Sequence, residues 1–148
     1  MGKNKTIEVL NKLIQVNNDR IEGYETAFGE TTDISLKALF TNCIDTSKLN
    51  NKALVFEVEK LDGKPIFGTK SALKLLKIWM NVKAFLTNRC ENTILKSCVF
   101  GENIAISIYQ KVLQKHIKSI NTQQNVMIIR QLSNIMKDNS QVKSKIHE

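Results

Sequence analysis

The sequence predicts an all-α fold, a four-helix bundle, on three observations. Apolar residues recur three and four positions apart over long stretches, which is the spacing of one face of an α-helix. Only one proline and six glycines occur among the 148 residues, so few positions break a helix. Hydrophobic residues make up 42 % of the chain, enough for one core, and we expect residues 1–148 to form a single domain.

Four long helices are expected, and the first two are the most clearly bounded. The first has an apolar stripe from Ile7 to Phe28, with Thr6 as its expected N-cap. Thr32 or Asp33 can cap the second helix, whose stripe continues into its last turns. The expected bounds of the four long helices are about 6–28, 34–61, 91–117 and 123–146.

A loop and a short crossover helix are expected between the second and third long helices. Residues 62–68 have the glycine and proline content of a loop, and a short apolar helix is expected over about 71–87. A segment of that length can carry the chain from one end of a bundle back to the other. The second and third long helices would then run parallel, in an antiparallel ferritin-like bundle with one long crossover.

Polar residues interrupt the apolar stripes near the middle of the long helices. In a bundle these groups would meet in one layer, and a buried amide without a partner costs about 1–3 kcal/mol. We expect the layer to fix how the helices slide against one another. A functional polar cavity and a surface position are the alternatives. The residues of this interior polar layer are Asn17, Ser47, Asn50, Glu102 and Asn139.

Motifs for catalysis and for metal binding are absent from the sequence. Carboxylate-bridged metal pairs in bundles use glutamates together with Glu-x-x-His pairs, but the two histidines of this chain belong to no such pair. There is also no glycine-rich phosphate loop, no HExxH and no GxSxG. The sequence therefore predicts no cofactor and no enzymatic activity.

The chain is basic, with a formal net charge of +8. Almost all of the positive charge comes from lysine, whereas nucleic-acid sites use the arginine fork as well. We interpret the nearest approach to a basic stripe as a solvated helix face, and we do not expect the chain to bind nucleic acid. That stripe consists of Lys70, Lys74 and Lys77, with Lys83 further along.

The cysteines indicate a reducing compartment. Cys43, Cys90 and Cys98 cannot all pair within the chain, and none lies in a CxxC motif. Cys43 and Cys98 lie on apolar helix faces, where a free thiol behaves as a small hydrophobe. No apolar run is long enough for a signal peptide or a membrane span. We therefore expect a cytoplasmic protein that makes no contact with a membrane.

Several different short motifs follow one another along almost the whole chain. They are residues 18–24 (NDRIEGY), 61–65 (LDGKP), 79–87 (WMNVKAFLT) and 130–132 (RQL), with Cys98, Gly101-Glu102 and Tyr109 between the last two. This set resembles an uncharacterised bacterial family of ferritin-like four-helix-bundle proteins, a domain of unknown function of about this length. The resemblance implies a ferritin-like fold and a suspected role in stress physiology.

The resemblance also bears on metal binding. Members of the family often carry a glutamate and a histidine on the last helix and a glutamate on the second, and these positions fall on Asn134, Asn139 and Ala53 here. Glu22 and Glu102 are the carboxylates that remain. Two carboxylates without imidazoles make a poor metal cage.

The function that we expect is that of a non-catalytic bundle acting by packing or protein interaction, with a homodimer or an unidentified protein as partner. The first alternative is a carboxylate-based metal-binding or redox bundle, whose degenerate site would use Glu22 and Glu102 with amide and water ligands. The second alternative is a basic surface that binds nucleic acid.

Overall fold

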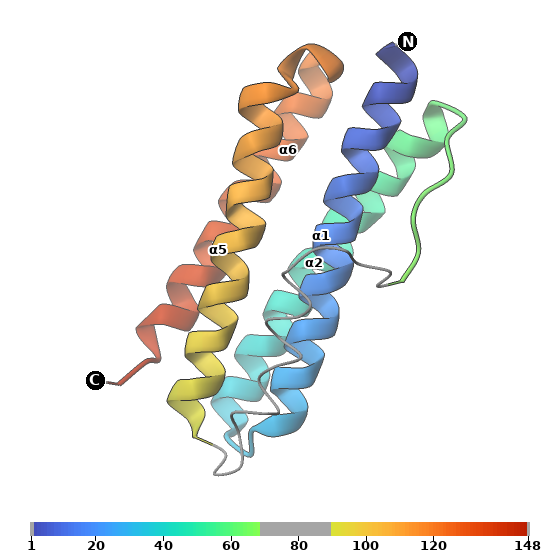
Figure 1. The fold of residues 1–148 in the computed structure, drawn as a ribbon. Helices are drawn as coiled ribbons and strands as arrows, with labels where there is room; N and C mark the ends of the chain where they lie inside the picture. Colours follow the sequence, from blue (N-terminus) through green and yellow to red (C-terminus); the bar gives the residue numbers. More distant parts are fainter. Residues whose placement is uncertain (1, 69–89, 148) are drawn as a thin grey trace.

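The structure, a computed structural model, describes residues 2–68 and 90–147 (Figure 1). All regular secondary structure in these residues is helical, so the predicted all-α four-helix bundle is confirmed. The crossover helix expected over about 71–87 lies outside the described residues. The helices are α1 (Gly2–Glu30), α2 (Ile34–Lys60), α5 (Glu91–Lys115) and α6 (Thr122–Ser144), with the 3-10 turn η1 (Ile117–Ser119) before α6.

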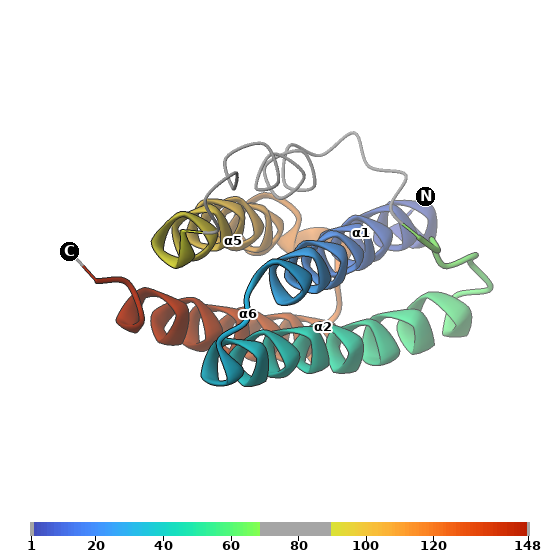
Figure 2. The same cartoon turned by 90° about the horizontal axis from the view of Figure 1, so that it is seen from below.

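The long helices form two layers. Figure 2 shows α1 beside α5 in one layer and α6 beside α2 in the other. The chain runs down α1, up α2, up α5 and down α6 in the view of Figure 1. Each helix is therefore antiparallel to both of its neighbours, while α2 and α5 run in the same direction, as expected for helices joined by a crossover.

The start of α1 differs from the prediction. The helix begins at Gly2, so Thr6 is not its N-cap but a residue within its second turn. The Thr6 hydroxyl lies 2.7 Å from the carbonyl oxygen of Gly2, and it also contacts the carbonyl oxygen of Ser119, the last residue of η1. A threonine inside a helix bonds to the preceding turn in this way. Its side chain thus holds η1 against α1.

Local signals set the other helix ends. Asp33 caps α2, as predicted, because its carboxylate accepts hydrogen bonds from the backbone N–H groups of Ser35 and Leu36. Asn121 and Gln124 form a capping box at the start of α6.

The end of α2 is a Schellman turn. Asp62 adopts a left-handed conformation with φ of 59°. The N–H of Asp62 donates to the carbonyl of Glu59, and the N–H of Gly63 donates to the carbonyl of Val58. This turn reverses the chain toward α1.

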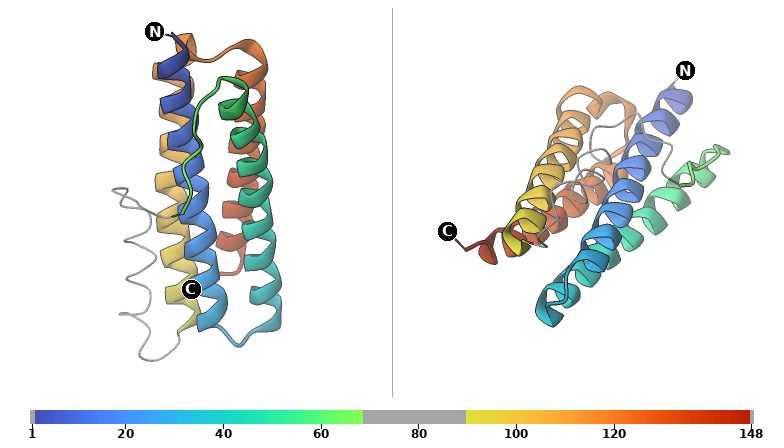
Figure 3. Two further views of the ribbon diagram at one scale, coloured as in Figure 1. Left: turned by 90° about the vertical axis from the view of Figure 1, so that its right-hand side faces the viewer. Right: turned by 60° about the horizontal axis from the view of Figure 1, so that its bottom comes forward.

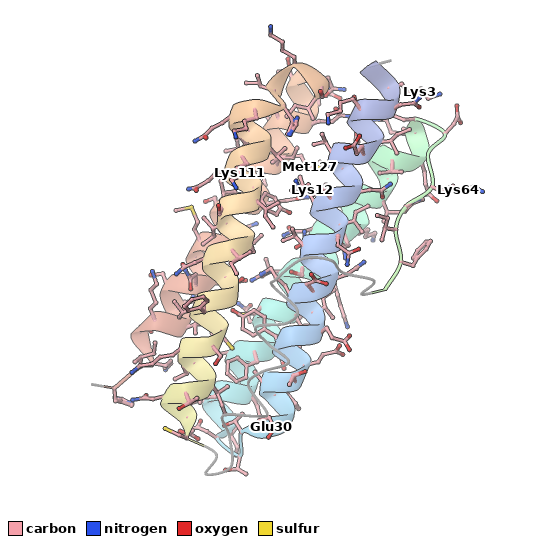
Figure 4. The ribbon with its side chains drawn as sticks, viewed as in Figure 1. Lys3, Lys12, Glu30, Lys64, Lys111 and Met127 are labelled. Atoms are coloured by element: carbon pink, nitrogen blue, oxygen red, sulfur yellow. The ribbon has the colours of Figure 1, made fainter. Side chains whose placement is uncertain are left out.

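Residues 61–68, which we call the return segment, lie along the outer side of α1 (Figure 3, left). Lys3 pairs with Asp62 at 3.4 Å at the start of the segment. Gly63 packs on Ile7 so closely that a Cβ atom at this position would lie 2.9 Å from the Ile7 side chain. Lys3 and Lys64 accordingly lie at the same edge of the bundle in Figure 4.

Two asparagines of α1 bind the backbone of the return segment. The Asn11 side chain donates to the carbonyl of Lys64 at 3.0 Å and accepts from the N–H of Ile66 at 3.0 Å. Two helical turns further along α1, the Asn18 side chain donates to the carbonyl of Gly68 at 2.9 Å. These bonds give a segment without secondary structure of its own a fixed place on the bundle.

The buried face of α1 agrees with the predicted stripe at Leu10, Ile14 and Tyr24, but it also includes neighbouring residues and leaves out the last one. Leu13 and Ala27 are fully buried, whereas Phe28, the last residue of the predicted stripe, is 37 % exposed. The buried residues follow the sequence Leu10, Leu13, Asn17, Arg20, Tyr24 and Ala27, again three and four apart. The polar members of this set, Asn17 and Arg20, lie at the centre of the bundle.

Candidate functional site

One polar side chain from each long helix meets in a layer at the centre of the bundle, which we call the ionic layer. The Arg20 guanidinium donates from Nε to Oε1 of Glu102 at 2.6 Å and from Nη2 to Oε2 at 2.8 Å. Nη2 also donates to Oδ2 of Asp138 at 3.2 Å, and Nη1 donates to the Ser47 hydroxyl. The layer therefore joins α1, α2, α5 and α6 through a single arginine.

Both partners of the Arg20–Glu102 pair are completely buried. Burial by itself would lower the pKa of Arg20, but the charge and the hydrogen bonds of Glu102 outweigh it and raise that pKa above its ordinary value. The guanidinium carbon also lies 5.5 Å from the centre of the Tyr24 ring. Arg20 is thus a permanent cation held by carboxylates and by one aromatic face.

Asp138 connects the ionic layer to the surface between α2 and α6. Its second carboxylate oxygen, Oδ1, accepts a hydrogen bond from Asn42 at 3.3 Å. The same residue borders a small polar recess of about 210 Å³. The other residues around the recess are Asn42, Thr46, Asn134, Lys137 and Gln141.

A second polar layer, which we call the amide layer, also takes one side chain from each helix. Asn50 donates to Oδ1 of Asn17 at 3.1 Å, and Asn17 donates to the Tyr109 hydroxyl at 2.8 Å. The hydroxyl donates to Oε1 of Gln131 at 2.8 Å, and Gln131 donates to the backbone carbonyl of Asn50 at 3.2 Å. The hydrogen bonds form a closed ring through all four helices.

The two layers contain most of the predicted interior polar residues. Asn17 and Asn50 lie in the amide layer, and Ser47 and Glu102 lie in the ionic layer. Asn139 is buried, but it bonds Asn103 at 3.2 Å between α5 and α6 and contacts neither layer through a hydrogen bond. The expected single layer is therefore two layers, from which Asn139 is separate.

Four members of the layers were not predicted. Arg20, Asp138 and Gln131 resemble ordinary surface residues in the sequence, and Tyr109 resembles a core aromatic residue. A signal for Arg20 was nonetheless present, because it continues the spacing of Leu13 and Asn17 on the buried face of α1. An arginine in that phase needs an anionic partner, and Glu102 interrupts the apolar face of α5.

The structure does not bring Glu22 and Glu102 together. Glu22 is exposed on α1, whereas both carboxylate oxygens of the buried Glu102 accept hydrogen bonds from Arg20. Within residues 2–68 and 90–147, no three His, Cys, Asp or Glu residues form a group that could hold a metal ion. The lysines considered for nucleic acid, Lys70, Lys74, Lys77 and Lys83, lie outside the described residues.

A groove on the outer side of the bundle is lined mainly by apolar side chains. It has a volume of about 690 Å³ and lies between α2, the edge of α1 and the return segment. Three large apolar side chains on it are mostly exposed: Leu49 by 68 %, Phe56 by 61 % and Phe67 by 77 %. Lys48, Lys52 and Glu59 add charge to its lining. Exposed apolar side chains gathered beside a groove are typical of a binding surface.

None of the three cysteines forms a disulfide; Cys43 and Cys98 are buried, as predicted, and Cys90 is exposed before α5. No helix in the described part of the chain has both the length and the apolar character that crossing a membrane requires.

The fold and its interior define the class of protein, which is an all-α four-helix bundle with a buried polar centre. Residues 5–115 match the family model of a domain of unknown function, DUF2383. The match covers well over half of the chain, and the protein belongs to this family. The resemblance to an uncharacterised domain family is thereby confirmed. No curated protein matches the chain.

Proposed function

We propose that this protein is a non-catalytic bundle that acts by binding another protein through the groove beside α2. The observation that carries the proposal is the exposure of Leu49, Phe56 and Phe67 around one groove. Together these side chains present apolar area that water solvates poorly, so a partner that covers them gains free energy.

The interior supports the same proposal from another direction. The side chains of the ionic and amide layers bond one another, and residues from all four helices are needed to complete each layer. Such groups specify how helices fit together. We infer that the polar centre keeps the bundle rigid, so that the α2 face is presented in one conformation.

The setting that we propose is a bacterial cytoplasm, with a ferritin-like ancestry and a role in stress physiology. Three cysteines that form no disulfide support a reducing compartment. The parallel course of α2 and α5 supports the ferritin-like relationship. The role in stress physiology stays a prediction from the family resemblance.

Photo-cross-linking in living cells tests the proposed binding face. A benzophenone amino acid replaces Phe56 in one version of the protein and Phe100 in another, and the adducts are identified by mass spectrometry. Phe100 is a matched control, because it is 65 % exposed on α5. We expect a protein adduct from position 56 that disappears when Leu49 is also changed to Ser. The absence of any adduct from position 56, or equal adducts from both positions, would refute the proposal.

A further inference from the structure

We infer that the occupant of the groove is a second copy of this chain, with its α2 lying antiparallel to the first α2 across a two-fold axis. This inference rests on the proposed function and adds the identity of the partner. Its basis is the order of charged and apolar residues along the outer face of α2.

The outer face of α2 carries a stripe of exposed residues at helical spacing. The positions are four, three, four and four residues apart, which keeps them on one face of the helix. Every one of them is exposed. The stripe consists of Asp45, Leu49, Lys52, Phe56 and Lys60.

A two-fold axis between Lys52 and Ala53 makes this stripe complementary to itself. An antiparallel copy then places its Phe56 opposite Leu49 and its Lys60 opposite Asp45, and the symmetry repeats each pair. The small Ala53 lies next to the axis, where two helices come closest. Lys52 has a long aliphatic stem that can cover apolar surface while its ammonium group stays in water.

The charges favour this arrangement over the alternatives. A parallel pairing in register would set Asp45 against Asp45 and Lys60 against Lys60, which is repulsive at both ends of the stripe. The whole chain carries +8, a net charge that opposes the association of two copies. The stretch of α2 from Asp45 to Lys60 differs, because its three lysines are balanced by three carboxylates. These are Lys48, Lys52 and Lys60 with Asp45, Glu57 and Glu59.

The return segment adds to the same surface. Asn18 bonds both the carbonyl of Gly68 and the side chain of Asn51, at 2.9 and 2.8 Å, so Phe67 is held near the level of Asn51 on α2. In the antiparallel pair, that level faces the partner's Ala53 to Phe56. Phe67 and Leu49 therefore form the two sides of a hollow that receives the Phe56 side chain of the other copy.

The test is the mass of the full-length protein in solution, measured by sedimentation over a range of concentrations. We expect a dimer whose dissociation constant rises about tenfold in Asp45→Lys and in Lys60→Asp, because each change turns two attractions into repulsions. The Asp45→Lys/Lys60→Asp double variant should restore the dimer, since exchanged charges are still complementary. This restoration cannot come from contacts within one chain. The 3.2 Å pair between Lys60 and Glu57 is lost both in Lys60→Asp and in the double variant.

Two further variants complete the test. Phe56→Ser should give a monomer with an unchanged helical circular dichroism spectrum, and Phe100→Ser, on α5, should leave the dimer intact. A wild-type protein that is monomeric at every concentration would overturn the inference, as would a dimer that is indifferent to Phe56→Ser and to both charge reversals. If the chain is monomeric and position 56 cross-links a different protein, self-association is wrong but the proposed binding face is retained.

Discussion

Arg20 on α1 and Glu102 on α5 form a two-bonded ion pair that has no contact with solvent. The two residues are 82 positions apart in the sequence, so the pair exists only in the assembled bundle. An isolated charge at this depth would be strongly unfavourable, and each partner is therefore tolerated because of the other. The same arginine reaches α2 and α6, and it is the residue on which the ionic layer depends.

Replacing Arg20 with Met should lower the free energy of unfolding by about 3–5 kcal/mol at neutral pH. The change leaves the carboxylates of Glu102 and Asp138 buried without their cation. The midpoint of urea unfolding at neutral pH measures this loss. Arg130→Met is the matched control at an exposed position and should leave the midpoint unchanged.

Alkaline titration should reveal both buried tyrosines. Tyr24 and Tyr109 are the two tyrosines of the chain, and burial raises the pKa of each, with the charge of Glu102 adding to the effect at Tyr24. A raised pKa means that their contribution to stability is complete below about pH 10 and is lost as the pH rises toward the folded-state value. The ultraviolet absorbance of tyrosinate should therefore appear only as the protein unfolds. In concentrated guanidinium it should appear near pH 10, and the same midpoint in the folded protein would show that the rings are accessible.

Gly63→Ala should destabilise the protein by about 1–3 kcal/mol. The added Cβ would lie 2.9 Å from the Ile7 side chain, so either the return segment or α1 must shift. Ile7→Ala in the same chain should recover part of the loss, because it removes the obstructing atoms. Gly29→Ala is the control, since nothing lies within 4 Å of its Cβ position and alanine favours a helix. Equal effects of the two glycine replacements in thermal melts would contradict the close packing.

Cysteine labelling should distinguish the three thiols. Cys90 is exposed, and a hydrogen bond with Thr93 is the main cause that lowers its pKa. Cys43 is buried, which raises the pKa of its thiol, and Cys98 is buried as well. Iodoacetamide should therefore modify Cys90 alone in the folded protein and all three cysteines after denaturation. Rapid labelling of Cys43 in native buffer would mean that the core opens readily.

The sequence was sufficient for the fold and for about half of the polar centre. The spacing of apolar residues predicts the four long helices, and Asn17, Ser47, Asn50 and Glu102 stand out because amides, hydroxyls and carboxylates interrupt apolar faces. Arg20, Gln131 and Asp138 were missed because a charged or long polar side chain fits equally well on a solvated face. Only the meeting of four helices brings their partners to them.

The outer surface of the bundle could be predicted less well. Leu49 and Phe56 lie on the side of α2 opposite Ser47 and Leu54, and helical spacing alone does not tell whether a partner covers apolar residues on that side. The return segment was predicted as a loop from its glycines and proline. Its place on α1 depends on Asn11 and Asn18, whose bonds join residues about fifty positions apart.

The polar layers hold the four helices together as mutual partners, and a double-mutant cycle on Arg20 and Glu102 measures this dependence. The free energies of unfolding of Arg20→Met, Glu102→Leu and the double variant are compared with that of the wild type. We predict that the double variant loses at least about 2 kcal/mol less than the sum of the two single losses, because each single change strands a buried charge. Losses that add to within about 0.5 kcal/mol would contradict the account, since the two side chains would then not depend on each other.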